Sequence, residues 1–355
     1  MEGYYKMPSI FGEEQDRADA QEIYMKKLSH NDPLAALKKT IKWEIFSEDL
    51  VRFRKSLKKN DTGRPPFDPL LMFKILILQS LYNLSDDVME FMIRDRLSFM
   101  HFLDLSPGDR VPDAKTIWYF RNELSKADMV ERLFSRFKEH LASQGLMTNK
   151  GQIIDASIEE SPRQRITLSE KTQISSGETP SNWSEFKTRQ KDTDATWTKK
   201  NEKSYFGYKN HVNADSSTKL ISRYAVTTAS VHDSQVFEEL LDVPEAPRNV
   251  VVYADKAYRS DANETILRGH KMKSRVLYRA SRNKPLSSEE KGKNSEWSRI
   301  RSRVEHVFGL QSKQIGNMVV RAIGYMRVRA CIGLRNLSYN MRRFVFLKKQ
   351  GVLCP

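Results

Sequence analysis

Residues 249–255, with the sequence NVVVYAD, place an unbroken apolar run directly before a carboxylate. A short run rich in β-branched residues predicts a buried strand, and Asp255 then lies where the strand ends. Residues 151–155, GQIID, repeat the pattern and end a second apolar run at Asp155. Ligand and metal sites in α/β folds favour the ends of strands. The two segments therefore predict a sheet that presents two acidic side chains at its rim.

The residues around these strands complete a mixed α/β pattern. A β-hairpin is predicted from residues 204–215 and 220–228, joined by a Ser-Ser-Thr-Lys turn. A short helix is expected at 234–241, a further strand at 274–278 and a helix at 296–310. The order strand, hairpin, helix, strand, strand, helix indicates an α/β domain with a central sheet flanked by helices.

The chain before Gly151 is predicted to be helical. Asp32 with Pro33, Ser85 and Asp113 have the residue types of helix N-caps. Short helices joined by tight turns fit a helix-turn-helix DNA-binding module, and they fit any small helical domain equally well. We expect four parts: a helical segment for oligomerisation or DNA contact at 1–63, a helical, DNA-binding domain at 64–146, a catalytic domain at 147–318 with a polar insertion at about 159–203, and a basic helical tail at 319–355.

The composition points to a polyanionic partner inside the cell. The chain has 60 Lys and Arg against 45 Asp and Glu, a net charge of +15. Such a surplus favours nucleic acid, because each neutralised phosphate releases condensed counterions. Two cysteines, Cys331 and Cys354, are too few for a disulfide scaffold or a cysteine metal site. With neither a signal peptide nor a membrane span in the pattern, we expect a cytoplasmic protein with no membrane partner.

A third acidic residue, Glu305, lies on the predicted helix at 296–310, between the apolar Val304 and Phe308. One face of that helix can pack while the carboxylate reaches the strand ends. Carboxylate oxygens suit Mg²⁺ or Mn²⁺, and two such ions can activate a nucleophile and stabilise the leaving oxygen. Each carboxylate taken alone also fits a strand cap or a surface salt bridge. Only the set of three, in the order strand, strand, helix, favours a catalytic site.

Several motifs in one order carry a resemblance that is more specific than spacing. They are IIDASI at 153–158, KSYFGYKNH at 203–211, TASVHDS at 228–234, VYADKAY at 252–258, RIRSRVEHVFG at 299–309 and GLRNLSYN at 333–340. With them the chain resembles the DDE transposases of bacterial insertion sequences, in the group with a Tyr-Arg-Glu-Lys signature. The likeness extends over about residues 60 to 345, because the helical stretch from Arg64 also resembles the N-terminal domain of these enzymes.

The resemblance implies an RNase H-like catalytic domain preceded by an all-α domain. Its acidic triad falls on Asp155, Asp255 and Glu305, which would hold catalytic Mg²⁺, with Mn²⁺ able to substitute. It implies binding of double-stranded DNA at the terminal inverted repeats, metal-dependent cleavage there, and transfer of the cut strand to target DNA. A homodimer on DNA is expected, because transposition holds two ends together. The enzyme would lie in the bacterial cytoplasm, associated with the nucleoid when bound to DNA.

The signature is matched in part. Arg301 precedes Glu305 by about one helical turn and matches the expected arginine, which would pair with a carboxylate or a scissile phosphate. Ser298 stands at the tyrosine position and Ser312 at the lysine position, so no role is carried over to either. Lys313, next to Ser312, remains a candidate phosphate contact.

Other residues are candidate DNA contacts with a structural alternative. Lys256 follows Asp255 and either touches phosphate or is a solvated lysine. Lys209 lies in an aromatic-rich strand that either stacks bases or packs against its neighbours. Trp183 and Trp197 stand in the polar insertion, where they either pack locally or wedge into DNA.

Two alternative functions remain open at this point. An RNase H-like nuclease that cuts without joining would have the same site, and a DNA-binding protein with an unused site would keep the fold. A zinc site is not expected, because His211, His232 and His306 lack the spacing of zinc ligands. His232 and Asp233 are instead expected to turn the chain after the hairpin.

Overall fold

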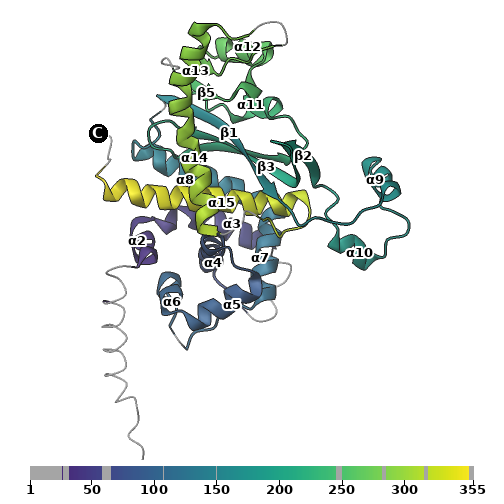
Figure 1. Ribbon diagram of the computed structural model, residues 1–355. Helices are drawn as coiled ribbons and strands as arrows, with labels where there is room; N and C mark the ends of the chain where they lie inside the picture. The colour runs from purple at the N-terminus through teal and green to yellow at the C-terminus, as the bar shows by residue number, and fades with distance from the viewer. Residues whose placement is uncertain are drawn as a thin grey trace, which may run out of the picture.

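The computed structural model describes residues 26, 32–57, 65–106, 108–148, 150–244, 250–281, 285–315 and 319–351. A six-stranded sheet forms the centre of the fold, and the helices of the N-terminal part lie on one side of it (Figure 1). The long helix α15 (Tyr325–Lys349) runs between that sheet and those helices.

Capping and apolar periodicity account for the N-terminal helices. The elements are α2 (Pro33–Thr40), the 3₁₀ turn η1 (Trp43–Phe46), α3 (Ser47–Leu57), α4 (Pro69–Tyr82), α5 (Asp86–Asp95), α6 (Leu97–Leu103), α7 (Ala114–Lys126) and α8 (Met129–Ser143). The predicted caps are confirmed, since the side chains of Asp32, Ser85 and Asp113 each accept a bond from a first-turn N–H. Helix α4 is apolar on almost every side and is buried, as its composition predicts.

The sheet has the topology of an RNase H-like fold, which confirms the predicted fold class. Its strands are β1 (Gly151–Glu160), β2 (Thr196–Lys200), β3 (Lys203–Asp215), β4 (Ile221–Thr228), β5 (Val251–Ala254) and β6 (Lys273–Val276). Strand β3 lies antiparallel between β4 and β1. Strands β5 and β6 then continue parallel to β1 on its other side. Strand β2 pairs with the beginning of β3 beyond this core.

The two faces of the sheet pack against different elements. Ile153 and Tyr253 face the large core that contains α4, α8 and α15. Ile154 and Val252 face a smaller core. The second core is covered by η2 (Asp233–Val236), α11 (Phe237–Leu240), η3 (Lys256–Tyr258) and α12 (Asp261–Gly269). The side-chain alternation of a strand therefore divides the protein into two layers around the sheet.

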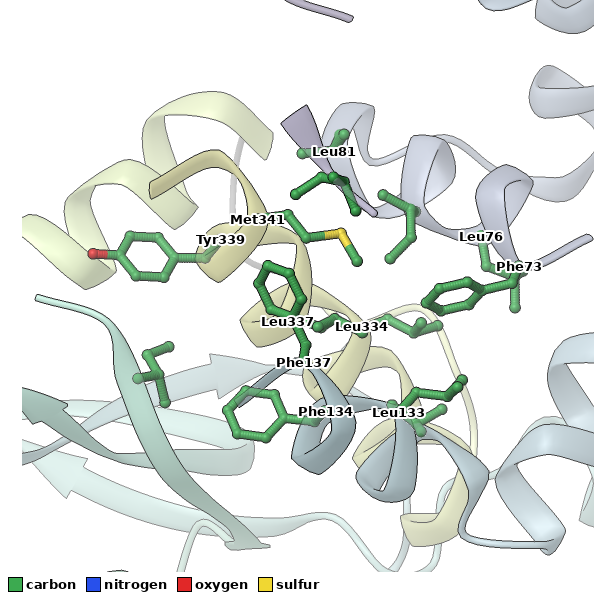
Figure 2. Packing of buried hydrophobic residues seen from close by; sticks show 14 of the residues in the cluster. Phe73, Leu76, Leu81, Leu133, Phe134, Phe137, Leu334, Leu337, Tyr339 and Met341 are labelled. Atoms are coloured by element: carbon green, nitrogen blue, oxygen red, sulfur yellow. The ribbon is translucent and has the colours of Figure 1, made fainter. Parts of the chain in front are cut away.

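Helix α15 lies in the predicted basic helical tail, and it is a core helix. Figure 2 shows Leu334, Leu337 and Met341 between side chains of α4 and α8. Two of its arginines bind internal partners: Arg335 pairs with Glu159, and Arg343 donates to the Thr218 carbonyl at 2.7 Å. Neither α15 nor any other helix of the described residues has the length and apolar character to cross a membrane.

The polar insertion between β1 and β2 contains two short helices, α9 (Leu168–Ser175) and α10 (Glu185–Gln190), which project away from the sheet (Figure 1). Glu170 holds them together. Its carboxylate accepts bonds from the Trp183 indole at 2.6 Å and the Lys187 ammonium at 2.9 Å. These bonds, together with a capping box between Thr167 and Glu170, order a segment that has little core of its own.

Candidate active site

Asp155 and Asp255 occupy equivalent positions on the adjacent parallel strands β1 and β5. The parallel pairing of β1 and β5 ends at Ile154 and Ala254. The residue that follows in each segment is an aspartate, Asp155 or Asp255. Asp255 ends its strand as expected. Asp155 does not, because β1 continues to Glu160 and stays paired with β3. Asp155 thus lies where its strand loses β5 as a neighbour, which opens the sheet beside its side chain.

Asp155 is held by Arg301. The guanidinium of Arg301, at the end of α13 (Ser288–Arg301), donates to the Asp155 carboxylate at 2.6 Å. The Ala156 N–H donates to the other carboxylate oxygen at 2.9 Å. Burial nevertheless raises the pKa of Asp155 above its usual value, against the lowering effect of Arg301, and the negative charge of Asp255 adds to the increase. The two aspartates are therefore close enough to repel each other.

Glu305 begins a new helix. The single helix expected at 296–310 is broken, because α13 ends at Arg301, a 3₁₀ turn η4 (Ser302–Val304) follows, and α14 (Glu305–Ile315) starts at the glutamate. Val304 and Val307 are fully buried and fix this junction against the core. The Glu305 side chain is exposed and has no hydrogen bond or ion pair to any residue that the structure describes.

The three predicted carboxylates do not form a finished metal site. Within the described ranges no group of three or more His, Cys, Asp or Glu side chains is placed to hold an ion. The structure brings Asp155 and Asp255 together with Arg301, and it leaves Glu305 outside this group. The donor set still fits a hard divalent cation, since two mutually repelling carboxylates supply the oxygen ligands and the charge that such an ion needs.

A buried tyrosine without a predicted role lies next to these carboxylates. Tyr258 follows Asp255 in the turn η3, and its hydroxyl is buried with no hydrogen-bond partner among the described residues. Burial raises its pKa, and the charges of Asp233, Asp155 and Asp255 raise it further. The motif VYADKAY contains this residue, but its burial depends on the packing of η3 against η2.

Two residues proposed to contact DNA, Trp183 and Lys209, bind other residues of the protein. Trp183 is 8% exposed and donates its indole N–H to Glu170, so it packs locally within the insertion. Lys209 pairs with Asp233 at 2.8 Å and donates to the Val231 carbonyl at 2.7 Å. Both side chains have partners inside the fold, and their contact with DNA stays a prediction.

The remaining candidates stay exposed or undescribed. Trp197 is 45% exposed and packs against Phe206, with ring centroids 5.2 Å apart. Lys256 is exposed beside Asp255. Lys313 lies on α14, but its side chain is outside the described part of the structure. His232 caps η2 by accepting from the Ser234 N–H, so its expected role in turning the chain is confirmed.

A buried polar network joins the candidate site to α15. Glu159, on the same face of β1 as Asp155, pairs with Arg335 and accepts from Ser157 at 3.0 Å. Beside it, the amide of Asn336 exchanges bonds of 3.0 Å with Asn210 of β3. The side-chain amide of Gln311, on α14, donates a hydrogen bond to the same Asn336 oxygen at 2.9 Å. These bonds connect the sheet, α14 and α15.

Sequence comparisons with known proteins indicate one family. A transposase domain model (DUF772) matches residues 22–123, and a transposase DDE domain model matches residues 182–341. The chain is 30% identical over 228 residues to the transposase for insertion sequence element IS1106 of Neisseria meningitidis serogroup B, a match that covers 62% of this chain and 75% of that protein. A solved structure, the piggyBac transposase synaptic complex with hairpin DNA, is similar over 92% of this chain and 78% of its own, with 13% identity and a TM-score of 0.47. The chain belongs to the DDE transposases of bacterial insertion sequences, enzymes that cleave DNA and transfer the cut strand.

Proposed function

We propose that this transposase acts on the terminal inverted repeats of its own insertion sequence through Asp155, Asp255 and Glu305. The observation that supports this most is the shared level of Asp155 and Asp255 on the adjacent parallel strands β1 and β5. The break between α13 and α14 adds to it, because it places Arg301 on Asp155 and Glu305 just after the turn. Transposition joins two ends, so we propose a homodimer on DNA in the bacterial cytoplasm.

Asp155 and Asp255 are the residues that would hold the cation, with Glu305 completing its ligands. We propose Mg²⁺, with Mn²⁺ able to replace it, since carboxylate oxygens suit both ions. When bound, the ion supplies charge for the scissile phosphate and lowers the pKa of the attacking hydroxyl or water.

The residues of the chain have separable tasks in this proposal. Asp155 is anchored by the Ala156 N–H, so one carboxylate oxygen keeps a fixed direction. Arg301 neutralises Asp155 while no cation or DNA is bound. The same guanidinium can donate two parallel bonds to a phosphate, and this makes it the group that orients the scissile phosphate when Asp155 no longer needs it.

The test is cleavage of a labelled duplex that carries the end of the insertion sequence, with Mg²⁺, with Mn²⁺ and with a chelator. We expect Asp255→Asn and Asp155→Asn to lower the cleavage rate by roughly 10³-fold or more, because the stabilisation from a bound ion is worth several kcal/mol. Asp261→Asn is the matched control, since Asp261 is an exposed aspartate on α12 outside the site.

The outcomes separate the parts of the proposal. Nicking by the wild type that needs the ion, with strand-transfer products, supports the carboxylate assignment. A wild type that binds the duplex and cuts nothing with either ion would overturn it. An equal loss in Asp261→Asn would show that the effect arises from the fold and not from the site.

A further inference from the structure

The turn between β3 and β4 is held by two arginines from distant segments. It runs from Ser216 to Lys219, where the backbone adopts a left-handed φ of 62°. The guanidinium of Arg303, in η4, donates to the Ser216 carbonyl at 2.9 Å. The Nε of Arg343, on α15, donates to the Thr218 carbonyl at 2.7 Å. Two positive charges therefore lie against this turn, beside the lysine that ends it.

A second lysine adjoins the same turn. The Gly151 carbonyl accepts a bond from the Ser216 N–H at 2.9 Å, so the chain at Lys150 runs beside Ser216. Lys150 is exposed, and its ammonium group has no hydrogen bond to any residue that the structure describes. We refer to the four cations around the turn as the basic cluster, which consists of Lys150, Lys219, Arg303 and Arg343.

The basic cluster has no acidic partner among the described residues. No ion pair joins any of its members to a carboxylate in those ranges. Asp215, the acidic residue at the start of the turn, is 5% exposed. Its carboxylate accepts bonds from the hydroxyl of Thr148 and from the N–H groups of Ser217 and Thr218. The one carboxylate of the turn is therefore used inside it, and the surface of the turn stays positive.

The charges of the basic cluster act on one another. Arg303 is exposed, and Lys219 and Arg343 are partly exposed. Burial lowers the pKa of Lys219, and the positive charges of Arg343 and Arg303 lower it further. Each guanidinium uses one N–H for a carbonyl and keeps further donors. An anion that binds here would meet these donors and relieve the repulsion between the cations.

The segment around η4 connects the basic cluster with the candidate site. Arg301 contacts Asp155, and Arg303, two residues later, contacts the turn at Ser216. Glu305 follows at the start of α14. One short stretch of chain therefore touches the first aspartate of the site, bears its glutamate and reaches the basic cluster.

The strand register gives the separation of cluster and site along the sheet. Gln152 of β1 pairs with Asp215, the residue before the turn, and Asp155 lies three positions farther along β1. At about 3.3 Å per residue, this separation is roughly 10 Å. Asp155 follows Ile153 by two residues, so its side chain points to the face of the sheet on which η4 and α15 pack. The basic cluster thus lies beside the carboxylates, on the same face.

We infer that the basic cluster binds the backbone of the duplex that is cut, on the flank of the cleavage site. B-DNA carries one phosphate charge per about 1.7 Å of its axis, so a stretch of about 10 Å carries roughly six charges. A duplex whose scissile phosphate lies at Asp155 therefore brings other phosphates to the level of the cluster. The inference rests on the proposed role of Asp155 in cleaving the end of the insertion sequence.

The test removes charge from the two lysines, because their ammonium groups make no bond within the described part of the chain. The variants are Lys150→Gln, Lys219→Gln, the combination of both, and the charge-preserving Lys219→Arg. Lys271→Gln is the matched control, since Lys271 is an exposed lysine that, like Lys219, has a positive φ, here 54°. It follows α12, in the layer on the opposite face of the sheet.

The dissociation constant of the labelled end duplex is measured over a range of NaCl concentrations, with a chelator present so that no strand is cut. Loss of one phosphate contact reduces the slope of log affinity against log salt by about one. We expect a reduction of about one for each single Gln variant of the cluster and of about two for the combination. Lys219→Arg and Lys271→Gln should keep the slope of the wild type. A combined variant with the wild-type slope, or the same loss in Lys271→Gln, would overturn the inference.

Uncharged methylphosphonates, placed one at a time in the end duplex, locate the contact. We expect the wild type to lose affinity at phosphates within about one helical turn, roughly 10 base pairs, of the cleavage site. The combined lysine variant should be insensitive to the same replacements. A loss of affinity by the lysine variants for a target duplex and not for the end duplex would overturn the assignment to the DNA that is cut.

The carboxylate assignment is judged separately, with Asp255→Asn. This variant should stop cleavage and leave the salt slope unchanged. If it still cuts, the carboxylate assignment fails whatever the lysine variants do. If it is inactive and the combined lysine variant binds like the wild type, only the inference about the basic cluster fails.

Discussion

Individual residues at the candidate site show burial and charge acting against each other. Burial raises the pKa of Asp155, and Arg301 at 2.6 Å limits the rise. His211 lies on β3, next to Val212, the residue that pairs with Asp155. Burial lowers the pKa of His211 to about 4, because desolvation outweighs the attraction of Asp233. The chain thus keeps an acid and a base near the same strands in environments that penalise their charged forms.

His211 should make stability depend on pH. Unfolded histidine takes up a proton near its ordinary value of about 6.5, whereas the folded side chain resists protonation until about pH 4. The stability contribution is therefore complete above pH 6.5 and is lost as the pH falls toward 4, a loss on the order of 3 kcal/mol.

Urea denaturation of the wild type and His211→Gln at pH 7, 5.5 and 4.5 measures this effect. The variant is expected to lose less stability over this range, since Gln does not titrate and can still bond to Thr227, which now lies 2.9 Å from the ring nitrogen. Parallel pH curves for the two proteins would contradict the assignment to His211.

Among the secondary-structure elements, α15 packs against both the N-terminal helices and the sheet. Its apolar residues pack on α4 and α8, and its polar residues reach the sheet. Asn336 bonds to both Asn210 and Gln311, and in this way connects the sheet with the helix that begins at Glu305. The basic residues Arg335 and Arg343 of α15 thus serve internal pairing.

The ion pair between Glu159 and Arg335 should be costly to break on one side. Both side chains are buried, so Arg335→Met leaves an unpaired carboxylate and is expected to lower the free energy of unfolding by about 3–5 kcal/mol. Arg342→Met, on an exposed position of the same helix, is expected to cost less than about 1 kcal/mol.

Chemical denaturation of Arg335→Met, Arg342→Met, Glu159→Leu and the double variant Glu159→Leu with Arg335→Met provides the measurement. The double variant should recover part of the lost stability, because it leaves no buried charge without a partner. If the double variant is as unstable as the sum of its single changes, the pair is not coupled as the structure indicates.

In the whole molecule, one core joins the helical part to the sheet. Phe73 of α4, Ile153 of β1 and Leu337 of α15 belong to the same buried cluster. The chain should therefore unfold as one cooperative unit where these parts meet. The division of the chain at residues 63, 146 and 318 stays a prediction.

Leu337→Ala tests the shared core. Leu337 is fully buried between α4 and α8, so the change is expected to cost about 2–5 kcal/mol. Trp43 reports on the helical part and Trp297 on the sheet side, so variants that keep only one of these two and lack the other four of the five tryptophans can be followed by fluorescence. Coincident transitions for the two reporters are expected, and transitions that separate would show that the parts unfold independently.

The sequence by itself determined the local features of this protein. Helix caps at Asp32, Ser85 and Asp113, the hairpin of β3 and β4, and the apolar runs directly before Asp155 and Asp255 all depend on residues a few places apart. Capping bonds and strand alternation act over such short distances, so the pattern of the chain is sufficient to predict them.

Only the tertiary structure decided what those residues meet. Arg301 reaches Asp155 across 146 positions of sequence, and Arg335 reaches Glu159 across 176. The helix break before Glu305 is a feature of the folded chain, and no local signal in the sequence marks it. Trp183 turns inward because Glu170 lies beside it in the folded insertion. These partners are chosen by packing between distant segments, and local propensity carries no information about that packing.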